Sequence, residues 1–308
     1  MVRNEFTFPS ADGKTAIHAV EWLPEGDIAA VLQISHGVSE YILRYEPFAI
    51  WLTERGFAVI GHDHLGHGDS VAEGAPRLHF GPKGSWTWVV DDIHTLRQRS
   101  GDKFSGVPYF LLGHSMGSFL ARTYLIRYPG TVNGAIIMGT GQMSPLLIAG
   151  GRLVAAMEGK RLGDSAASPL VAQLSFASYN KLFAPNRTTF DWLSVNEENV
   201  DRYIADPLCG GNASVGLFGE MLGGMNFIAK AEHLKQMDPS IPVLFISGEM
   251  DPVGDCGKGV KLAYESFCTT GVQDVSLKLY PELRHEILCE KEKELVFEDI
   301  YQWLKDKM

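Results

Sequence analysis

Residues 110–118 read FLLGHSMGS and contain the pattern G-x-S-x-G with Ser115 at its centre. An apolar run (109–113) leads into the pattern, and residues 115–130 follow it with helical spacing and a terminal Pro-Gly. This order predicts a strand, a tight turn and a helix, and such a turn raises a serine hydroxyl above the edge of a sheet. The small residues Gly113 and Gly117 permit the turn, so Ser115 is a candidate nucleophile.

Outward from this turn, apolar runs alternate with segments of helical spacing. The runs from residue 29 onward are largely apolar, which is typical of strands buried on both faces of a parallel sheet. The first two runs flank the turn SADG and predict a β-hairpin. The pattern predicts an α/β fold with a mostly parallel, doubly wound sheet. Strands are expected at 5–9, 16–22, 29–36, 57–63, 109–113, 134–139, 242–248 and 275–280, and helices at 44–55, 85–99, 115–130 and 291–305.

The alternation of strands and helices stops between residues 141 and 235. This segment has no predicted strand, but it contains apolar pieces of helical character at 145–157, 168–183 and 215–228. Because the segment is inserted after a strand of the sheet, we expect a helical cap over the carboxyl ends of the strands. The expected organisation is an α/β core of residues 1–140 and 236–308 with a cap of residues 141–235.

A serine nucleophile needs a base and an acid, and two strand ends offer them. Asp251 follows the penultimate predicted strand in EMDPVG, and His285 follows the last one in PELRHE. Glu249 is a rival acid, although the spacing after the strand favours Asp251. The order Ser115, Asp251, His285 is that of α/β-hydrolase triads, and parallel strands bring all three to one edge of the sheet.

The oxyanion that forms during acyl transfer needs two N–H donors. Met116 follows the candidate nucleophile at the start of a helix, so its N–H is one candidate. The loop ISHGVSEY (34–41) follows the third predicted strand and turns at His36-Gly37. We therefore expect an oxyanion hole made by the backbone N–H groups of Val38 and Met116.

Residues 60–70, IGHDHLGHGDS, contain three closely spaced histidines and raise the question of a metal site. A binuclear zinc site would need Asp before the third histidine, where Gly66 stands, and further ligands at strand ends that the triad already uses. The segment also reads D-x-x-G-x-G-x-S, which is typical of a turn. We interpret His62, His64 and His67 as loop residues, with His62 and His64 hydrogen-bonding neighbouring loops, and we predict neither a metal nor a cofactor.

The composition argues against several classes of partner. With 37 acidic and 27 basic residues, the formal net charge of −10 disfavours nucleic acid and anionic lipid surfaces. No apolar stretch reaches the roughly 18 residues of a membrane span, and no secretory signal is visible. The four cysteines form no C-x-x-C pair, which favours a reducing, cytoplasmic location. The sequence does not determine the oligomeric state.

At these residues the chain resembles the monoacylglycerol lipase and lysophospholipase group of α/β-hydrolases. The matching segments are HGVSEYILRY (36–45), GHDHLGHGDS (61–70), GHSMGS (113–118) and the strand ends that carry the acid and the base. The resemblance implies ester hydrolysis through an acyl-serine intermediate, with a helical cap that forms an acyl-chain tunnel. It also implies that Glu40 and Arg44 line the polar end of the site.

The apolar content of the cap favours a single-chain lipid ester, such as a monoacylglycerol, as the substrate. It is also compatible with a transient contact between the cap and a membrane. The side chains expected to line the acyl-chain tunnel are Leu146, Leu217, Phe218 and Met221, with Leu147, Leu174 and Leu222 as further apolar cap residues.

Two other functions remain open on the same scaffold. An aminopeptidase or amidase would hold a free amine with carboxylates of the cap, and Glu197, Glu198 and Asp201 form the nearby cluster. These charges also suit a solvated helix face. A non-catalytic ligand receptor would keep the fold without the reaction, although an intact triad argues against it.

Overall fold

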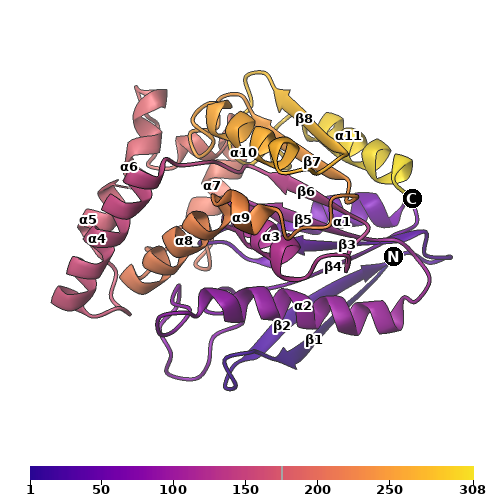
Figure 1. Ribbon diagram of the computed structural model, residues 1–308, viewed down its shortest axis with the longest axis horizontal. Coiled ribbons are helices and arrows are strands. Elements are labelled where there is room, and N and C mark those ends of the chain that lie inside the picture. Colours follow the sequence, from indigo (N-terminus) through magenta and orange to yellow (C-terminus); the bar gives the residue numbers. More distant parts are fainter. Residues whose placement is uncertain (175) are drawn as a thin grey trace.

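The computed structural model describes residues 1–174 and 176–308 and is built on one eight-stranded sheet (Figure 1). The order across the sheet is β1-β2-β4-β3-β5-β6-β7-β8. β1 and β2 form the predicted hairpin, β2 is antiparallel to β4, and all pairs from β4 to β8 are parallel. The predicted α/β fold with a mostly parallel sheet is confirmed. The strands are β1 (Val2–Pro9), β2 (Ala16–Leu23), β3 (Ala30–Ser35), β4 (Phe57–His62), β5 (Tyr109–His114), β6 (Gly134–Met138), β7 (Val243–Gly248) and β8 (Val275–Tyr280).

Helices cover both faces of the sheet. The core on one face includes side chains of α2 (Trp86–Lys103), α3 (Met116–Arg127) and α10 (Lys258–Thr269). The core on the other face includes α1 (Glu46–Thr53), which follows the 3-10 turn η1 (Ile42–Tyr45), and α11 (Lys293–Asp306). This two-sided packing makes β3 to β7 buried at every position, as their apolar runs predict.

Strand β8 corrects one expectation, because its run VSLKLY is predicted to be buried and is not. Only Tyr280 of this strand is buried, and the other five residues are half-buried or exposed. β8 lies at the edge of the sheet and pairs only with β7. An apolar run therefore indicates a strand here without indicating its depth in the sheet.

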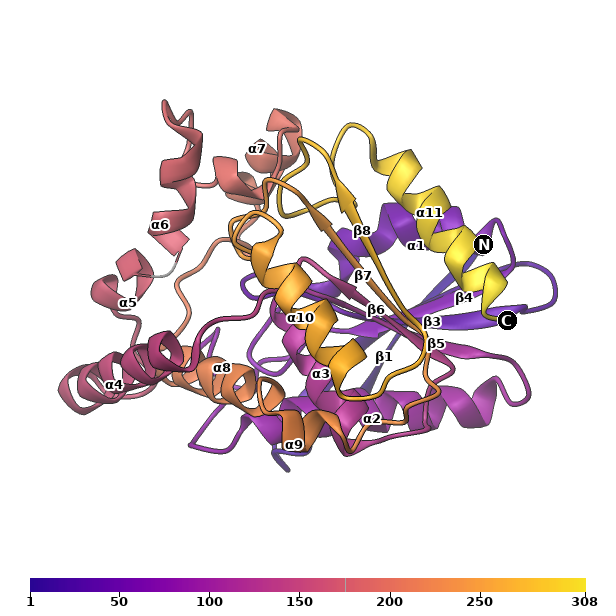
Figure 2. The same ribbon diagram turned by 45° about the horizontal axis from the view of Figure 1, so that its top comes forward.

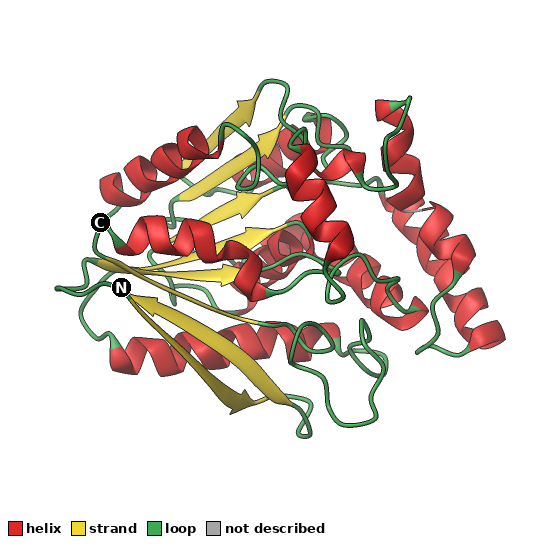
Figure 3. Ribbon diagram, turned by 180° about the vertical axis from the view of Figure 1, so that it is seen from behind, coloured by secondary structure: helices red, strands yellow, loops and turns green. Residues whose placement is uncertain are grey.

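Between β6 and β7 the described residues form helices that are joined by loops. One isolated β-bridge pairs Ala167 with Ser214. Figures 2 and 3 show this layer beyond the arrowheads of the parallel strands. α8 packs against α3, and α4 packs against α8. Residue 175, inside the predicted piece 168–183, lies outside the described residues. The helices are α4 (Pro145–Leu162), α5 (Pro169–Leu174), α6 (Phe176–Tyr179), η2 (Asn180–Phe183), η3 (Asp191–Leu193), α7 (Glu197–Ala205), α8 (Val215–Ile228) and α9 (Ala231–Leu234). None of the helices described combines the length and apolar character needed to cross a membrane.

Candidate active site

Ser115 lies at the sharp turn between β5 and α3. Its φ of 54° and ψ of −121° are values that residues with a side chain rarely adopt. The turn is tight because backbone segments approach closely on both sides of the serine. A Cβ on Gly117 would lie 2.0 Å from the carbonyl oxygen of Ser35, and one on Gly113 would lie 2.3 Å from the carbonyl oxygen of Gly117. Both positions of the pattern therefore require glycine for space.

Asp251 and His285 follow β7 and β8 and meet at the same edge of the sheet. His285 Nδ1 lies 2.9 Å from Asp251 Oδ2, and the fully buried Asp251 also accepts hydrogen bonds from the Ser247 hydroxyl and the Val253 N–H. The rival acid Glu249 is exposed. Burial disfavours the imidazolium, but the Asp251 carboxylate, together with the charges of Glu286 and Glu40, raises the pKa of His285 above its ordinary value. Because Nδ1 is held by the acid, Nε2 is left for proton transfer.

Ser115 and His285 line one cavity of about 510 Å³. Among the described contacts no hydrogen bond joins Ser115 Oγ to His285 Nε2, and such bonds are often long in sites without substrate. The larger part of the wall is apolar and comes from the insertion between β6 and β7. The apolar wall residues from the insertion are Ala167, Pro169, Ala172, Phe190, Trp192 and Leu193, with Gln173, Thr189, Tyr203 and Asn212 as polar neighbours.

The two predicted oxyanion donors lie on segments next to the nucleophile. Val38 lines the cavity, and Met116 is the first residue of α3, where helical N–H groups carry partial positive charge. Within the described residues, neither N–H donates a hydrogen bond to another protein atom. The loop bearing Val38 passes so close to the elbow that a Cβ on Gly37 would lie 3.1 Å from Ser115 Cβ. Two free donors beside the nucleophile suit an oxyanion.

Glu40 and Arg44 do not line the polar end of the Ser115 cavity in the way expected. Glu40 reaches its wall, but its Oε1 accepts hydrogen bonds from the Gly37 N–H at 2.6 Å and from the Tyr45 hydroxyl at 2.8 Å. Arg44 is absent from that wall and lines a neighbouring cavity of about 310 Å³. Its guanidinium forms ion pairs with the carboxylates of Glu40 and Glu286, so it is not available to bind a ligand.

The four apolar residues expected to line an acyl-chain tunnel lie elsewhere, and those assignments are wrong for this cavity. Leu217 and Met221 are buried in the core that α8 forms with α3, and Phe218 is half-buried beside them. Leu146 is 83% exposed on α4. Of the further cap residues, Leu222 is buried in the same core, whereas Leu147 and Leu174 are exposed. An apolar stripe predicts that one face of a helix is buried, but it does not say against what. In α8 this face packs against the core and not against the cavity.

Trp192 is the cavity residue that sequence reasoning missed. It lies on η3, is buried, and its ring centroid is 5.1 Å from that of His285. The only signal in the sequence is that it is the single tryptophan between residues 141 and 235. A single tryptophan in such a segment gives no information about its depth, so this signal is weak without the fold.

The histidine-rich loop behaves mainly as a structural turn. His64 Nε2 lies 2.9 Å from the Ser35 hydroxyl, as predicted, and its ring contacts that of His36. The same prediction is wrong for His62, because neither of its ring nitrogens has a hydrogen-bond partner among the described residues and the ring packs edge-on against Phe8. Burial lowers the pKa of both His62 and His67 to about 3, so these rings are neutral at physiological pH.

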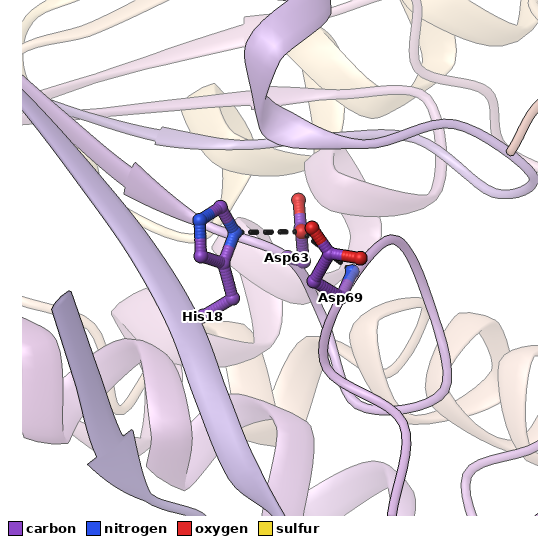
Figure 4. Close-up of side chains that lie close together, drawn as sticks. All are labelled: His18, Asp63 and Asp69. Carbon is purple, nitrogen blue, oxygen red and sulfur yellow. Dashed lines mark hydrogen bonds and ion pairs between the residues drawn. The ribbon is translucent and has the colours of Figure 1, made fainter. Parts of the chain in front are cut away.

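A different group in this region comes nearer to a metal-ligand arrangement. His18, Asp63 and Asp69 have potential ligand atoms within 4.8 Å of one another, and no other such group occurs in the part of the chain that the structure describes (Figure 4). Asp63 is already engaged, because its carboxylate accepts hydrogen bonds from His18 Nδ1 and from the Ile42 and Asp69 N–H groups. The His18–Asp63 hydrogen bond, acting against burial, raises the pKa of His18 to about 9. The group is therefore explained as an ion pair that holds the loop.

The acidic cluster that an aminopeptidase would use lies away from the cavity. Glu197, Glu198 and Asp201 are exposed on α7, and none of them lines the space beside Ser115. Asp201 pairs with Arg187 at 2.7 Å. These side chains form the solvated helix face considered above.

Comparison with known proteins places this arrangement in a family. The family model described as "Serine aminopeptidase, S33" matches residues 26–292. Human monoglyceride lipase is 30% identical over 291 residues, covering 93% of this chain and 86% of the human protein. Monoacylglycerol lipase from Mycolicibacterium smegmatis is 29% identical over 312 residues, with 98% and 97% covered.

A solved structure agrees closely with the whole fold. A thermostable carboxyl esterase from Bacillus coagulans, in complex with glycerol, superposes with a TM-score of 0.92 at 27% identity and covers 99% of each chain. The chain therefore belongs to the monoacylglycerol lipase and lysophospholipase family of α/β-hydrolases, and it is a carboxylic ester hydrolase of that family.

Proposed function

We propose that the chain hydrolyses single-chain lipid esters, such as monoacylglycerols, through an acyl-serine intermediate. One observation carries the proposal: Ser115 and the Asp251-bound His285 line one cavity with a largely apolar wall. The names of the monoacylglycerol lipases among its relatives support the substrate class.

The reaction follows from the arrangement of donors and acceptors. His285 Nε2 takes the proton of the Ser115 hydroxyl, and Ser115 Oγ attacks the ester carbonyl carbon. The negative charge that develops on the carbonyl oxygen is stabilised by the N–H groups of Val38 and Met116. As the ester C–O bond breaks, the imidazolium gives its proton to the leaving alcohol. Water, deprotonated by the same nitrogen, then attacks the acyl-serine and releases the fatty acid and the free serine.

A chain-length series of p-nitrophenyl esters beside a monoacylglycerol panel tests the substrate class. Each methylene that moves from water into an apolar wall gains about 0.8 kcal/mol, so kcat/KM should rise about four-fold per carbon until the cavity is full. The Ser115→Ala variant controls for non-enzymatic hydrolysis. A profile that peaks at acetate would refute the lipid substrate while leaving the ester chemistry intact.

An aminopeptidase remains a second candidate because the matching family model carries that description. The carboxylates at the cavity wall, Glu40 and Glu286, are both engaged with Arg44, which leaves no free acid for an amine. Aminoacyl p-nitroanilides assayed with the same enzyme separate the two reactions. A fluorophosphonate probe that failed to label Ser115 would instead favour a non-catalytic receptor.

We also propose that the outer surface of the cap contacts lipid transiently when substrate is taken up. Large apolar side chains are exposed there on consecutive helices: Leu146, Leu147, Leu153, Met157, Leu170, Leu174 and Leu182. The net charge of −10 points to a neutral rather than an anionic lipid surface. Sedimentation with phosphatidylcholine vesicles should retain the wild type and lose a Leu146→Glu, Leu153→Glu variant. Equal sedimentation of both would refute this contact.

All four cysteines are free, which supports the cytoplasmic setting that we propose for the chain. Microscopy of a tagged chain in its native cell tests this location, and a signal outside the cytoplasm would refute it.

A further inference from the structure

A buried ionic bridge lies behind the wall of the Ser115 cavity. Arg44 Nη1 is 2.8 Å from Glu40 Oε2 and 2.6 Å from Glu286 Oε1, and Arg44 Nη2 is 2.9 Å from Glu286 Oε2. The exposed fractions of the three side chains are 12%, 4% and 5% for Arg44, Glu40 and Glu286. The contact between Arg44 and Glu286 is bidentate, and this geometry fixes the orientation of the two side chains as well as the distance between them.

Each end of the bridge is tied to a segment that carries part of the catalytic machinery. Glu40 accepts the Gly37 N–H, and Gly37 precedes the candidate oxyanion donor Val38. Glu286 follows His285 directly in the chain. Arg44 therefore spans the oxyanion loop and the loop of the catalytic base.

Two further contacts link the bridge to the nucleophile and to the cap. His114 precedes Ser115, and its ring lies 3.1 Å from Glu40 Oε1 through Nδ1 and 3.3 Å from the His285 carbonyl oxygen through Nε2. Asn199 on α7 donates to Glu286 Oε2 at 2.6 Å. The bridge thus joins four segments that are far apart in sequence.

We propose that Arg44 is a positioning residue, which sets the separation between the oxyanion loop and the His285 loop through its simultaneous hold on Glu40 and Glu286. The proposal rests on the serine-hydrolase function proposed above. Arg44 does not line the cavity that contains Ser115, so it acts only through Glu40 and Glu286.

The charges of the bridge also bear on His285. The charged and titratable groups around this imidazole are Asp251, Glu40 and Glu286 as anions, Arg44 as the cation paired with Glu40 and Glu286, and His114. Removal of the Glu286 charge makes the surroundings less negative and favours neutral His285. This change follows from charge, whereas Arg44→Lys keeps the charge and therefore tests the geometry of the bridge.

The test measures how fast a fluorophosphonate labels Ser115 as a function of pH, because this rate depends on the triad and not on the choice of substrate. Arg44→Lys keeps the charge but cannot form the two-pronged contact, so the plateau rate should fall about 10-fold to 100-fold with the acidic midpoint unchanged. Glu286→Gln should move the acidic midpoint to lower pH. The double variant should lose little beyond the larger single effect, because both changes break one bridge.

Matched controls keep these outcomes interpretable. Arg55→Lys changes an arginine just after α1, and Glu282→Gln changes an exposed acid three residues before His285, so both should label like the wild type. Thermal unfolding shows which variants are folded, and Arg44→Lys carries the test if Glu286→Gln fails to fold. Wild-type labelling by folded Arg44→Lys, or an unmoved midpoint in folded Glu286→Gln, would overturn the proposal. An unlabelled wild type would refute the proposed serine chemistry itself.

Discussion

Gly117→Ala should impair both stability and catalysis, because a methyl group at this position has no room. Its Cβ would lie 2.0 Å from the Ser35 carbonyl oxygen and 2.6 Å from that of His36. Real contacts of this kind begin near 3.0 Å, so the carbonyls must retreat by about 1 Å. These atoms belong to the chain that leads into Val38, and a shift of about 1 Å in a catalytic group costs about 100-fold in rate.

The stability change is the difference between two terms. Overpacking a well-packed site costs about 1–3 kcal/mol, whereas replacing glycine by alanine within a helix gains about 0.5–1 kcal/mol. The expected net loss of up to about 2.5 kcal/mol should appear as a fall of several degrees in the melting temperature. Gly150→Ala on α4 is the matched control, because nothing lies within 4 Å of its Cβ and only the helical gain applies. Gly117→Ala with wild-type kcat and melting temperature would refute this account of the elbow.

Three other predictions concern the triad and one buried acid. Ser115→Ala should lower kcat by about 10⁴-fold to 10⁶-fold with the melting temperature nearly unchanged, and residual activity of a few per cent would contradict the nucleophile assignment. Because His285 must be neutral to act as a base and its pKa is raised, kcat/KM should fall as the pH drops through a midpoint above 6.5; a midpoint below 6 would count against the Asp251 contact. Burial raises the pKa of Asp92 from 3.8 to about 7, so folding favours its protonated form and its contribution to stability is lost as the pH rises through this range. Asp92→Asn should therefore stabilise the fold increasingly from pH 4 to pH 7, and thermal unfolding at several pH values would expose a pH-independent effect.

The parts of the structure that sequence predicts well are those with local causes. The elbow at Ser115 is set by glycines two residues away on each side, and the burial of β3 to β7 follows from runs that are largely apolar. Asp251 and His285 could be placed together because parallel strands end at one edge. In each case the evidence lies within a few residues of the feature.

The cavity wall has no such local cause. Leu217 and Trp192 lie in the same insertion, and the sequence favours the first as a ligand contact because it belongs to an apolar helix. The structure buries Leu217 in the core and brings Trp192 against His285. Which face of α8 meets the core depends on α3, which lies about 100 residues away in the sequence, so no pattern within the insertion specifies it.

The sequence correctly predicts that Glu40 and Arg44 lie near the active site, but it does not predict that they pair with protein groups. Both lie close to the active site, but the four-residue spacing between them lets them pair with each other at 2.8 Å. Glu286 then forms a second ion pair with the guanidinium from a loop more than 200 residues later, and Arg44 in turn holds the pKa of Glu286 below its usual range in spite of burial. A charge paired in this way cannot bind a polar substrate group without breaking a buried ion pair, a loss of about 3–5 kcal/mol. We therefore propose that uncharged groups on the cavity wall recognise the alcohol part of the ester, and Gln173, Thr189 and Asn212 carry side-chain donors and acceptors there.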